Sequence, residues 1–191
     1  MERRLVRGFC DELESLAIGT GARDVHEVGC GEGELLLRLA RRGLRARGSD
    51  VSESVIDEAR GRAAAAQLEV SFRAAPIEAL DPSEDSAELV LCCEVLEHLH
   101  DPDAALEIVA GLARPWAIVS VPREPLWRVL NLGRLKYVRG LGNTPGHLQH
   151  WSRRSFLGLL ERRLEVVAVR TPLPWTMALC KSGESSQTAH P

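Results

Sequence analysis

The sequence predicts a single α/β domain in which a mostly parallel sheet is covered by helices on both faces. From Val25 to Val121, short segments of strand length alternate with longer segments whose apolar residues recur at helical spacing. The segment Ala87–Cys93 is apolar almost throughout, which is typical of a parallel strand buried on both faces. A chain of 191 residues without a long linker or an internal repeat fits one domain with a substantial core.

The first elements lead into a glycine-rich turn. Glu2–Leu16 carries apolar residues at helical spacing and is followed by glycines, so it predicts an amphipathic helix. Val25–Val28 is a short strand that runs directly into the turn Gly29–Gly33. A helix is expected after the turn, and Gly43 suits the left-handed residue that ends such a helix.

The remaining elements continue the alternation. Ser52 or Ser54 is expected to cap one helix, while Asp101 and Pro102 supply the cap and first turn of a later one. In chain order, the elements are a strand over Leu44–Ser49, a helix through Ala66, strands over Leu68–Phe72 and Ala87–Cys93, a helix from Asp101 to about Ala113, a strand over Trp116–Val121, a helix after Ser152, and strands over Leu164–Arg170 and Trp175–Lys181. The domain thus spans 1–181, and the small polar tail Ser182–Pro191 is expected to fray.

Composition excludes several classes of protein. Hydrophobic residues make up 45% of the chain and charged residues 27%, as in ordinary globular domains and unlike disordered chains. The longest uninterrupted apolar run, Leu89–Cys93, is far too short to cross a membrane, and no signal-peptide core follows the basic start Met1–Arg7. The five cysteines form no Cys-x-x-Cys pair, which disfavours a disulfide framework or a zinc knuckle and predicts a cytoplasmic location.

Positive charge is concentrated in one part of the chain. The formal net charge is −3, yet the segment from Pro122 to Arg163 holds nine cationic and two acidic side chains, a net charge of +7. Such asymmetry is typical of a face that meets an anionic partner, and equally of a solvated basic surface.

The predicted topology gathers several segments at one edge of the sheet. Because crossovers between parallel strands are right-handed, the carboxyl ends of the strands meet at the edge where such sheets bind ligands. The segments expected there are Glu27–Gly33, Asp50, Ala75–Glu78, Glu94–His98 and the chain from Pro122 onward.

The glycine turn departs from a dinucleotide-binding fingerprint. That fingerprint needs glycine at relative positions 1, 3 and 6, whereas here Glu34 is at position 6 and glycine at position 5. Glu27 and Glu32 would repel a pyrophosphate, so a ligand with an amino group or a sulfonium suits the turn better. Asp50 follows about twenty residues later, where a carboxylate can accept both hydroxyls of a ribose.

With these motifs, the chain resembles the small class I S-adenosylmethionine-dependent methyltransferases of types 11 and 12. The resemblance rests on Glu27–Gly33, Gly48–Asp50, Glu88–Cys93, Glu94–His98 and Asp101–Pro102. It implies a Rossmann-like, doubly wound, seven-stranded sheet whose last strand is antiparallel, with S-adenosylmethionine as cofactor. Carried over by position, the cofactor-binding residues are Glu27, Gly29, Cys30, Gly31, Gly33, Asp50, Val51, Pro76, Ile77, Glu78, Cys93 and Glu94. Asp50 would hold the ribose, Val51 would pack on the adenine, and Glu94 would lie beside the sulfonium.

The string Glu94-x-x-Glu97-His98, with His147 and His150 further on, leaves two interpretations open. Two acids and histidines can bind a cation, and small-RNA 3′-terminal 2′-O-methyltransferases are similar in this layout. The same string is common in small-molecule methyltransferases that need no metal, where Glu97 and His98 would join the strand end to the next helix. We predict that no metal is bound.

The segment 123–151 is long for a connection and is expected to form a lid over the acceptor. Trp127 and Tyr137 either line the acceptor pocket or serve only in packing. His147 and His150 are the predicted catalytic residues, since histidine accepts protons near neutral pH. The predicted function is methyl transfer from S-adenosylmethionine to a small-molecule acceptor, and the basic segment leaves open whether that acceptor is anionic. The alternatives are a metal-assisted RNA 2′-O-methyltransferase, which would bind nucleic acid, and a cofactor-binding protein without catalysis.

Overall fold

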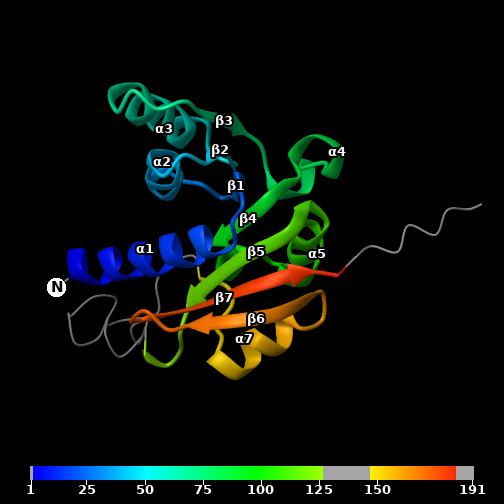
Figure 1. Ribbon diagram of the computed structural model, residues 1–191. Coiled ribbons are helices and arrows are strands. Elements are labelled where there is room, and N and C mark those ends of the chain that lie inside the picture. The colour runs from blue at the N-terminus through cyan, green and yellow to red at the C-terminus, as the bar shows by residue number, and fades with distance from the viewer. Residues whose placement is uncertain (1, 127–146, 184–191) are drawn as a thin grey trace, which may run out of the picture.

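The centre of the molecule is a seven-stranded sheet with strand order β3-β2-β1-β4-β5-β7-β6 (Figure 1). The computed structural model describes residues 2–126 and 147–183. The strands are β1 (Asp24–Val28), β2 (Arg45–Asp50), β3 (Val70–Ala74), β4 (Ala87–Cys93), β5 (Ala113–Pro122), β6 (Leu164–Arg170) and β7 (Trp175–Ser182). The pairs from β3 to β5 are parallel, and β7 is antiparallel to both β5 and β6. The predicted fold class is therefore confirmed.

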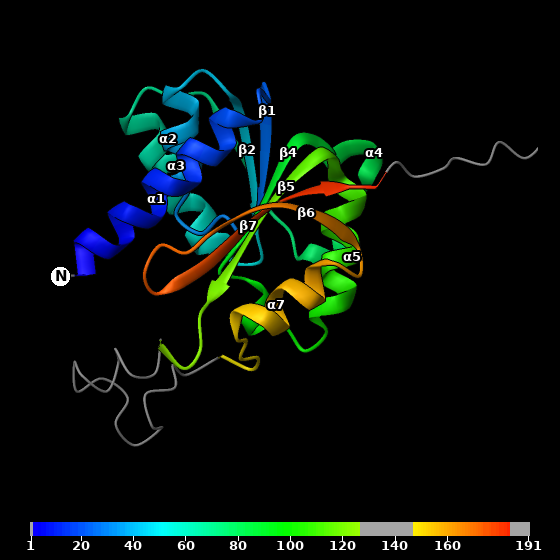
Figure 2. The ribbon, with the colours of Figure 1, turned by 60° about the horizontal axis from the view of Figure 1, so that its bottom comes forward.

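Helices cover both faces of this sheet (Figure 2). One layer contains α1 (Glu2–Gly19), α2 (Glu34–Arg41) and α3 (Glu53–Ala65), and the other contains α4 (Pro82–Asp85), α5 (Pro102–Leu112) and α7 (Arg153–Leu160). Two short 3₁₀ helices, η1 (Ile77–Ala79) and η2 (Leu96–His98), follow β3 and β4. Both therefore lie at the carboxyl edge of the parallel strands.

The central strand β4 shows why the sheet needs two layers. Leu89 and Leu91 pack into the core formed with α1, α2 and α3, whereas Val90 and Cys92 pack into the core formed with α5 and α7. All four side chains are 0% exposed. Successive residues of a strand point to opposite faces, so an apolar run of this kind is stable only between two helical layers.

Two of the predicted element ends are set by the expected residues, and two others differ from the prediction. Gly43 has φ +93° after α2, and the Asp101 side chain accepts a hydrogen bond from Ala104 N at 3.0 Å at the start of α5. Ser52 occupies the N-cap of α3, but its side chain makes no capping hydrogen bond and instead lies 3.1 Å from Ser54 Oγ. Strand β3 begins two residues later than predicted, because Gln67 in the left-handed region (φ 55°) still belongs to the turn after α3.

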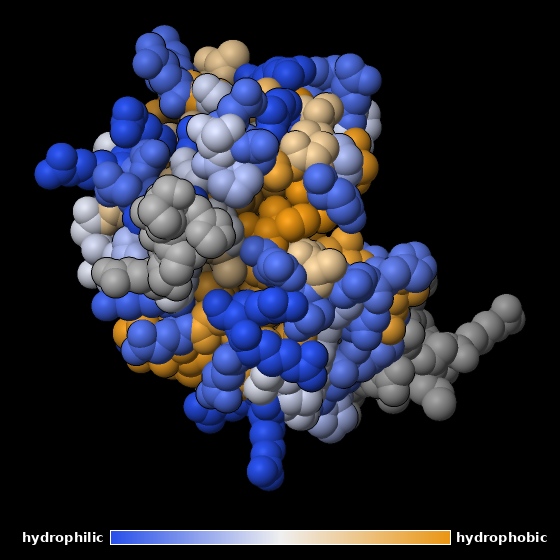
Figure 3. Space-filling view, turned by 90° about the vertical axis from the view of Figure 1, so that its right-hand side faces the viewer, coloured by the Kyte–Doolittle hydropathy of each residue, from blue (hydrophilic) through white to orange (hydrophobic). Residues whose placement is uncertain are grey.

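The surface of the molecule is mostly polar, and its cysteines lie inside. Seen from the right-hand side of Figure 1, most of the surface is hydrophilic, with apolar side chains gathered in a central hollow (Figure 3). No helix in the described ranges has the length and apolarity needed to cross a bilayer. All five cysteines are buried and free in the structure.

Candidate functional site

A cavity of about 370 Å³ opens at the carboxyl edge of the parallel strands. Strand order reverses between β1 and β4, and a crevice forms at such a switch point because the two connections leave in opposite directions. The cavity is lined by Val28, Gly29, Asp50, Val51, Ala75, Pro76, Ile77, Glu78, Glu94, Val95, His98 and Leu99. Four of the five segments that the sequence placed at this edge therefore come together around one space of the size of a small-molecule site, whereas no described residue from Pro122 onward lines it.

The glycine turn after β1 is tied to the end of β2. Ser49 O accepts hydrogen bonds from Gly29 N at 2.8 Å and from Cys30 N at 3.0 Å. Gly29 has φ +72°, and a Cβ there would collide with the Val95 side chain. Gly31 has φ +51°, and no atom lies within 4 Å of where its Cβ would be. The turn therefore needs glycine at 29 for packing, whereas the space beside Gly31 is open.

The Asp50 carboxylate is held rigidly at the cavity wall. Its Oδ2 accepts a hydrogen bond from Gly31 N at 3.0 Å, and its Oδ1 accepts one from Ser52 N at 3.0 Å. Each carboxylate oxygen has a second lone pair, so both can still accept hydrogen bonds from ligand hydroxyls. This arrangement fits the predicted ribose-binding role of Asp50.

Glu27 lies beneath the turn and is 3% exposed. Its Oε2 has no hydrogen-bond partner among the described residues. Burial, and secondly the nearby Asp50 charge, raise the pKa of the Glu27 carboxyl well above its usual range. An orphaned buried acceptor next to the glycine turn fits a ligand that brings a positively charged donor, as the amino group of S-adenosylmethionine would.

Glu94 is fixed by two strands that lie far away in the sequence. Its Oε2 accepts a hydrogen bond from Trp175 Nε1 at 2.6 Å, and its Oε1 accepts one from Ser120 Oγ at 3.1 Å. The backbone of Glu94 has φ 60°, a conformation that non-glycine residues keep only when their surroundings enforce it. Burial, and then the charge of Glu97, raise the pKa of the Glu94 carboxyl well above its usual range.

The predicted cofactor residues divide into two groups. Those that line the cavity are Gly29, Asp50, Val51, Pro76, Ile77, Glu78 and Glu94. Those that support it from the turn and the strands, outside the lining, are Glu27, Cys30, Gly31, Gly33 and Cys93. The sequence did not predict that Ser120 and Trp175 hold Glu94, because nothing in their local sequence links them to it.

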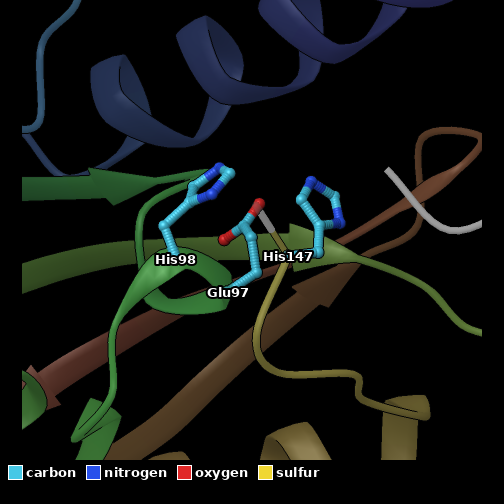
Figure 4. A group of neighbouring side chains, drawn as sticks. All are labelled: Glu97, His98 and His147. Carbon is cyan, nitrogen blue, oxygen red and sulfur yellow. The ribbon is translucent and has the colours of Figure 1, made fainter. Parts of the chain in front are cut away.

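Glu97, His98 and His147 form a second group beside the cavity (Figure 4). One ligand atom from each residue lies within 4.8 Å of the others, and the two imidazole rings meet edge to face with centroids 5.0 Å apart. Burial lowers the pKa of His147 to about 4, with smaller contributions from His98 and His150.

The two predicted catalytic histidines are placed differently. Leu148 N and Gln149 N donate hydrogen bonds to Glu97 O at 2.7 and 3.1 Å, which fixes this extended segment against η2. Along it, His147 is half-buried and His150 is exposed. His147 is therefore the one that joins Glu97 and His98 in the second group.

The ends of the predicted lid lie side by side. Arg123 and Trp151 form a parallel bridge, and Glu124 N donates a hydrogen bond to Trp151 O at 2.9 Å. The segment thus leaves and returns at the site edge, while Trp127 and Tyr137 lie outside the described residues.

Comparisons with known proteins identify the family. Residues 25–115 match the family model described as a methyltransferase domain. The chain is 31% identical over 169 residues to the ubiquinone biosynthesis O-methyltransferase of Hahella chejuensis, covering 81% of this chain and 69% of that protein. The chain belongs to the class I S-adenosylmethionine-dependent methyltransferases.

Two further methyltransferases are similar to this chain, one in sequence and one in structure. The ubiquinone biosynthesis O-methyltransferase of Alkalilimnicola ehrlichii is 32% identical over 155 residues, 74% of this chain; the chain spans 63% of that protein's length. The magnesium protoporphyrin IX methyltransferase of Synechocystis PCC 6803, crystallised with bound SAH, has a TM-score of 0.75 at 22% identity, covering 95% of this chain and 85% of that one. The structural likeness confirms the class I methyltransferase fold across nearly the whole chain.

Proposed function

We propose that this chain binds S-adenosylmethionine in the cavity between β1, β2 and β4 and transfers its methyl group to a small-molecule acceptor. The observation that carries the proposal is the Asp50 carboxylate, fixed by Gly31 N and Ser52 N at the cavity wall with lone pairs still open. Two relatives named for ubiquinone biosynthesis and the magnesium protoporphyrin IX enzyme support a small-molecule acceptor.

The cavity offers each part of the cofactor a matching environment. Asp50 would accept hydrogen bonds from the ribose, and the apolar side chains Val51 and Ile77 would contact the adenine. Glu27 and Glu94 would balance the positive charge of the amino and sulfonium groups. When bound, the cofactor supplies an electrophilic methyl group, so the protein's task is to hold the acceptor in line with it and to exclude water.

The acceptor side of the proposed reaction lies toward Glu97, His98 and His147. His98 belongs both to the cavity lining and to this group, so the group adjoins the cavity. We propose that His147, which is half-buried, acts on the acceptor rather than the exposed His150. The basic segment 122–163 supports an anionic acceptor and a covering role for 123–151, and the free cysteines support a cytoplasmic location.

Calorimetric titration with S-adenosylmethionine tests the cofactor assignment. Asp50→Ala should weaken binding by about 1–3 kcal/mol, the cost of losing hydrogen bonds to a charged group. Asp57→Ala is a matched control, because Asp57 is an exposed acid on α3 that contacts Arg60. NAD should not compete. Equal affinity of the wild type and Asp50→Ala would contradict the assignment, and tight NAD binding would contradict the cofactor class.

Acceptor identity is open to a mass-spectrometric screen. The protein is incubated with S-adenosylmethionine and a panel of small molecules that carry hydroxyl, carboxyl or amine groups. The expected result is one product that gains a methyl group together with stoichiometric S-adenosylhomocysteine. Methylation of RNA alone would contradict a small-molecule acceptor.

A further inference from the structure

The carboxylate of Glu97 is buried without a hydrogen-bond partner among the described residues. It is 1% exposed, and neither carboxylate oxygen has a hydrogen-bond partner among the described residues. A buried carboxylate that lacks a partner is destabilising, so such groups are normally paired or bound to a cation. In the sequence alternative, Glu97 and His98 join the strand end to the next helix by hydrogen bonds, and the Glu97 carboxylate makes no such bond among the described residues. The carbonyl of Glu97, not its carboxylate, accepts the bonds from Leu148 and Gln149.

Two imidazoles surround this carboxylate. His98 extends from η2, His147 comes from the segment after the predicted lid, and Figure 4 shows both rings directed to the same space as the Glu97 carboxylate. Donor atoms bound to one ion at about 2.1 Å lie about 3–4 Å apart. The ligand atoms of this group lie within 4.8 Å of one another, so binding one ion would need them to move closer by about 1 Å.

The backbone holds this group in place. Leu148 N and Gln149 N are bonded to Glu97 O, and Gln149 Nε2 donates to Leu99 O at 3.3 Å. His147 is therefore fixed next to η2 through its own neighbours. Glu94, by contrast, is occupied by Ser120 and Trp175, so it is not part of the group despite its place in the sequence string.

We propose that Glu97, His98 and His147 bind one divalent transition-metal ion at the acceptor side of the cavity. Two imidazoles and one carboxylate suit ions such as Zn²⁺, Co²⁺ or Mn²⁺, whereas Mg²⁺ and Ca²⁺ prefer oxygen ligands throughout. Three protein ligands leave at least one position open, which an electron-pair donor of the acceptor would occupy. The inference deepens the proposed function and rests on it for the role of the ion. It differs from the sequence-based expectation that no metal is bound, and the experiments below decide between the two.

Metal binding is measured directly on the full chain after treatment with a chelator. Calorimetry with Zn²⁺ should give one site per chain, and Co²⁺ should produce a visible absorption band from the bound ion. Glu97→Gln and His147→Ala should each weaken binding at least about tenfold. The matched controls are Glu107→Gln and His100→Ala, which change exposed residues of the same types outside the group. Equal binding by all variants, or none by the wild type, would overturn the proposal.

A stability measurement separates a metal ligand from a structural residue. In metal-free protein, Glu97→Gln replaces an unpartnered buried charge with a neutral amide, so urea unfolding should show equal or greater stability. With Zn²⁺ present, the wild type should become the more stable protein. Marked destabilisation of metal-free Glu97→Gln would show that Glu97 is structural and would overturn the proposal.

Cofactor titrations on the same samples separate this inference from the proposed function. Glu97→Gln should still bind S-adenosylmethionine, since Asp50 and the glycine turn are unchanged. Cofactor binding without metal binding would overturn the metal site alone. Metal binding without cofactor binding would support the site while contradicting the proposed function.

Discussion

At the scale of single residues, the site depends on side chains whose partners are distant in sequence. Glu94 combines a left-handed backbone with a carboxylate bonded to Ser120 and Trp175. The indole of Trp175 also packs against Phe9, with ring centroids 5.0 Å apart, so one side chain joins α1, β7 and the cavity wall. Trp175 is thus a positioning residue for Glu94.

Trp175→Phe should lower the free energy of unfolding by about 1–3 kcal/mol, because the ring still packs while a buried carboxyl oxygen loses its donor. Urea unfolding checks this result. Trp116→Phe is the matched control, since Trp116 is half-buried on β5 and faces Lys181 Nζ at 4.9 Å rather than the cavity. Cofactor affinity should also fall in Trp175→Phe and not in the control. A loss of equal size in both proteins would argue against a positioning role.

At the scale of elements, the alternation of strands and helices was predictable because it depends on local periodicity. The positions of Asp50, the glycine turn and Glu94–His98 followed from the rule that parallel strands end at one edge. The hydrogen bond between Glu94 and Trp175 spans 81 residues and depends on the register of β5 with β7, which no local pattern encodes. For the same reason, the sequence could suggest His147 and His150 as a pair but could not tell which one faces Glu97.

The buried histidine of β1 shows how one residue connects several elements. His26 Nδ1 lies 2.8 Å from Asp85 O, and its Nε2 lies 3.1 Å from Ser49 Oγ, so it joins β1 to β2 and to the end of α4. Burial is the largest influence on the pKa of His26 and lowers it; Arg47 and Arg73 also lower it, whereas Asp85 raises it. Folding therefore favours the neutral ring.

Stability should consequently decline as the pH falls below about 6.5, where the unfolded chain takes up a proton at His26 that the folded chain resists. Replacing His26 with Gln removes the contribution of His26 to the pH dependence of stability and leaves the contributions of all other titratable groups unchanged. The stability difference between wild type and His26→Gln should therefore shrink between pH 8 and pH 5, by at most about 1.4 kcal/mol per pH unit. Urea unfolding at each pH measures it, and a constant difference would refute the argument.

At the scale of the whole molecule, the cavity joins the two halves of the sheet. The half formed by β1, β2 and β3 contributes the glycine turn and Asp50, and the half that begins with β4 contributes Glu94 and His98. The apolar cores on the two faces share these strands, so the domain is expected to unfold as one unit. A ligand that contacts both halves should then stabilise the entire domain and not one part of it.

S-adenosylmethionine should accordingly raise the melting temperature in a single transition. At a concentration about 100 times its Kd, binding contributes about 2.7 kcal/mol, which corresponds to roughly 5–11 °C for a domain of this size. Asp50→Ala should show a much smaller shift at the same ligand concentration, because its affinity is lower. Ile118→Val, a change in the core far from any cavity-lining residue in sequence, should melt at a lower temperature yet keep the full shift. Calorimetric melting curves measure these shifts in melting temperature. If Asp50→Ala kept the full ligand-induced shift, the stabilisation would arise outside this cavity.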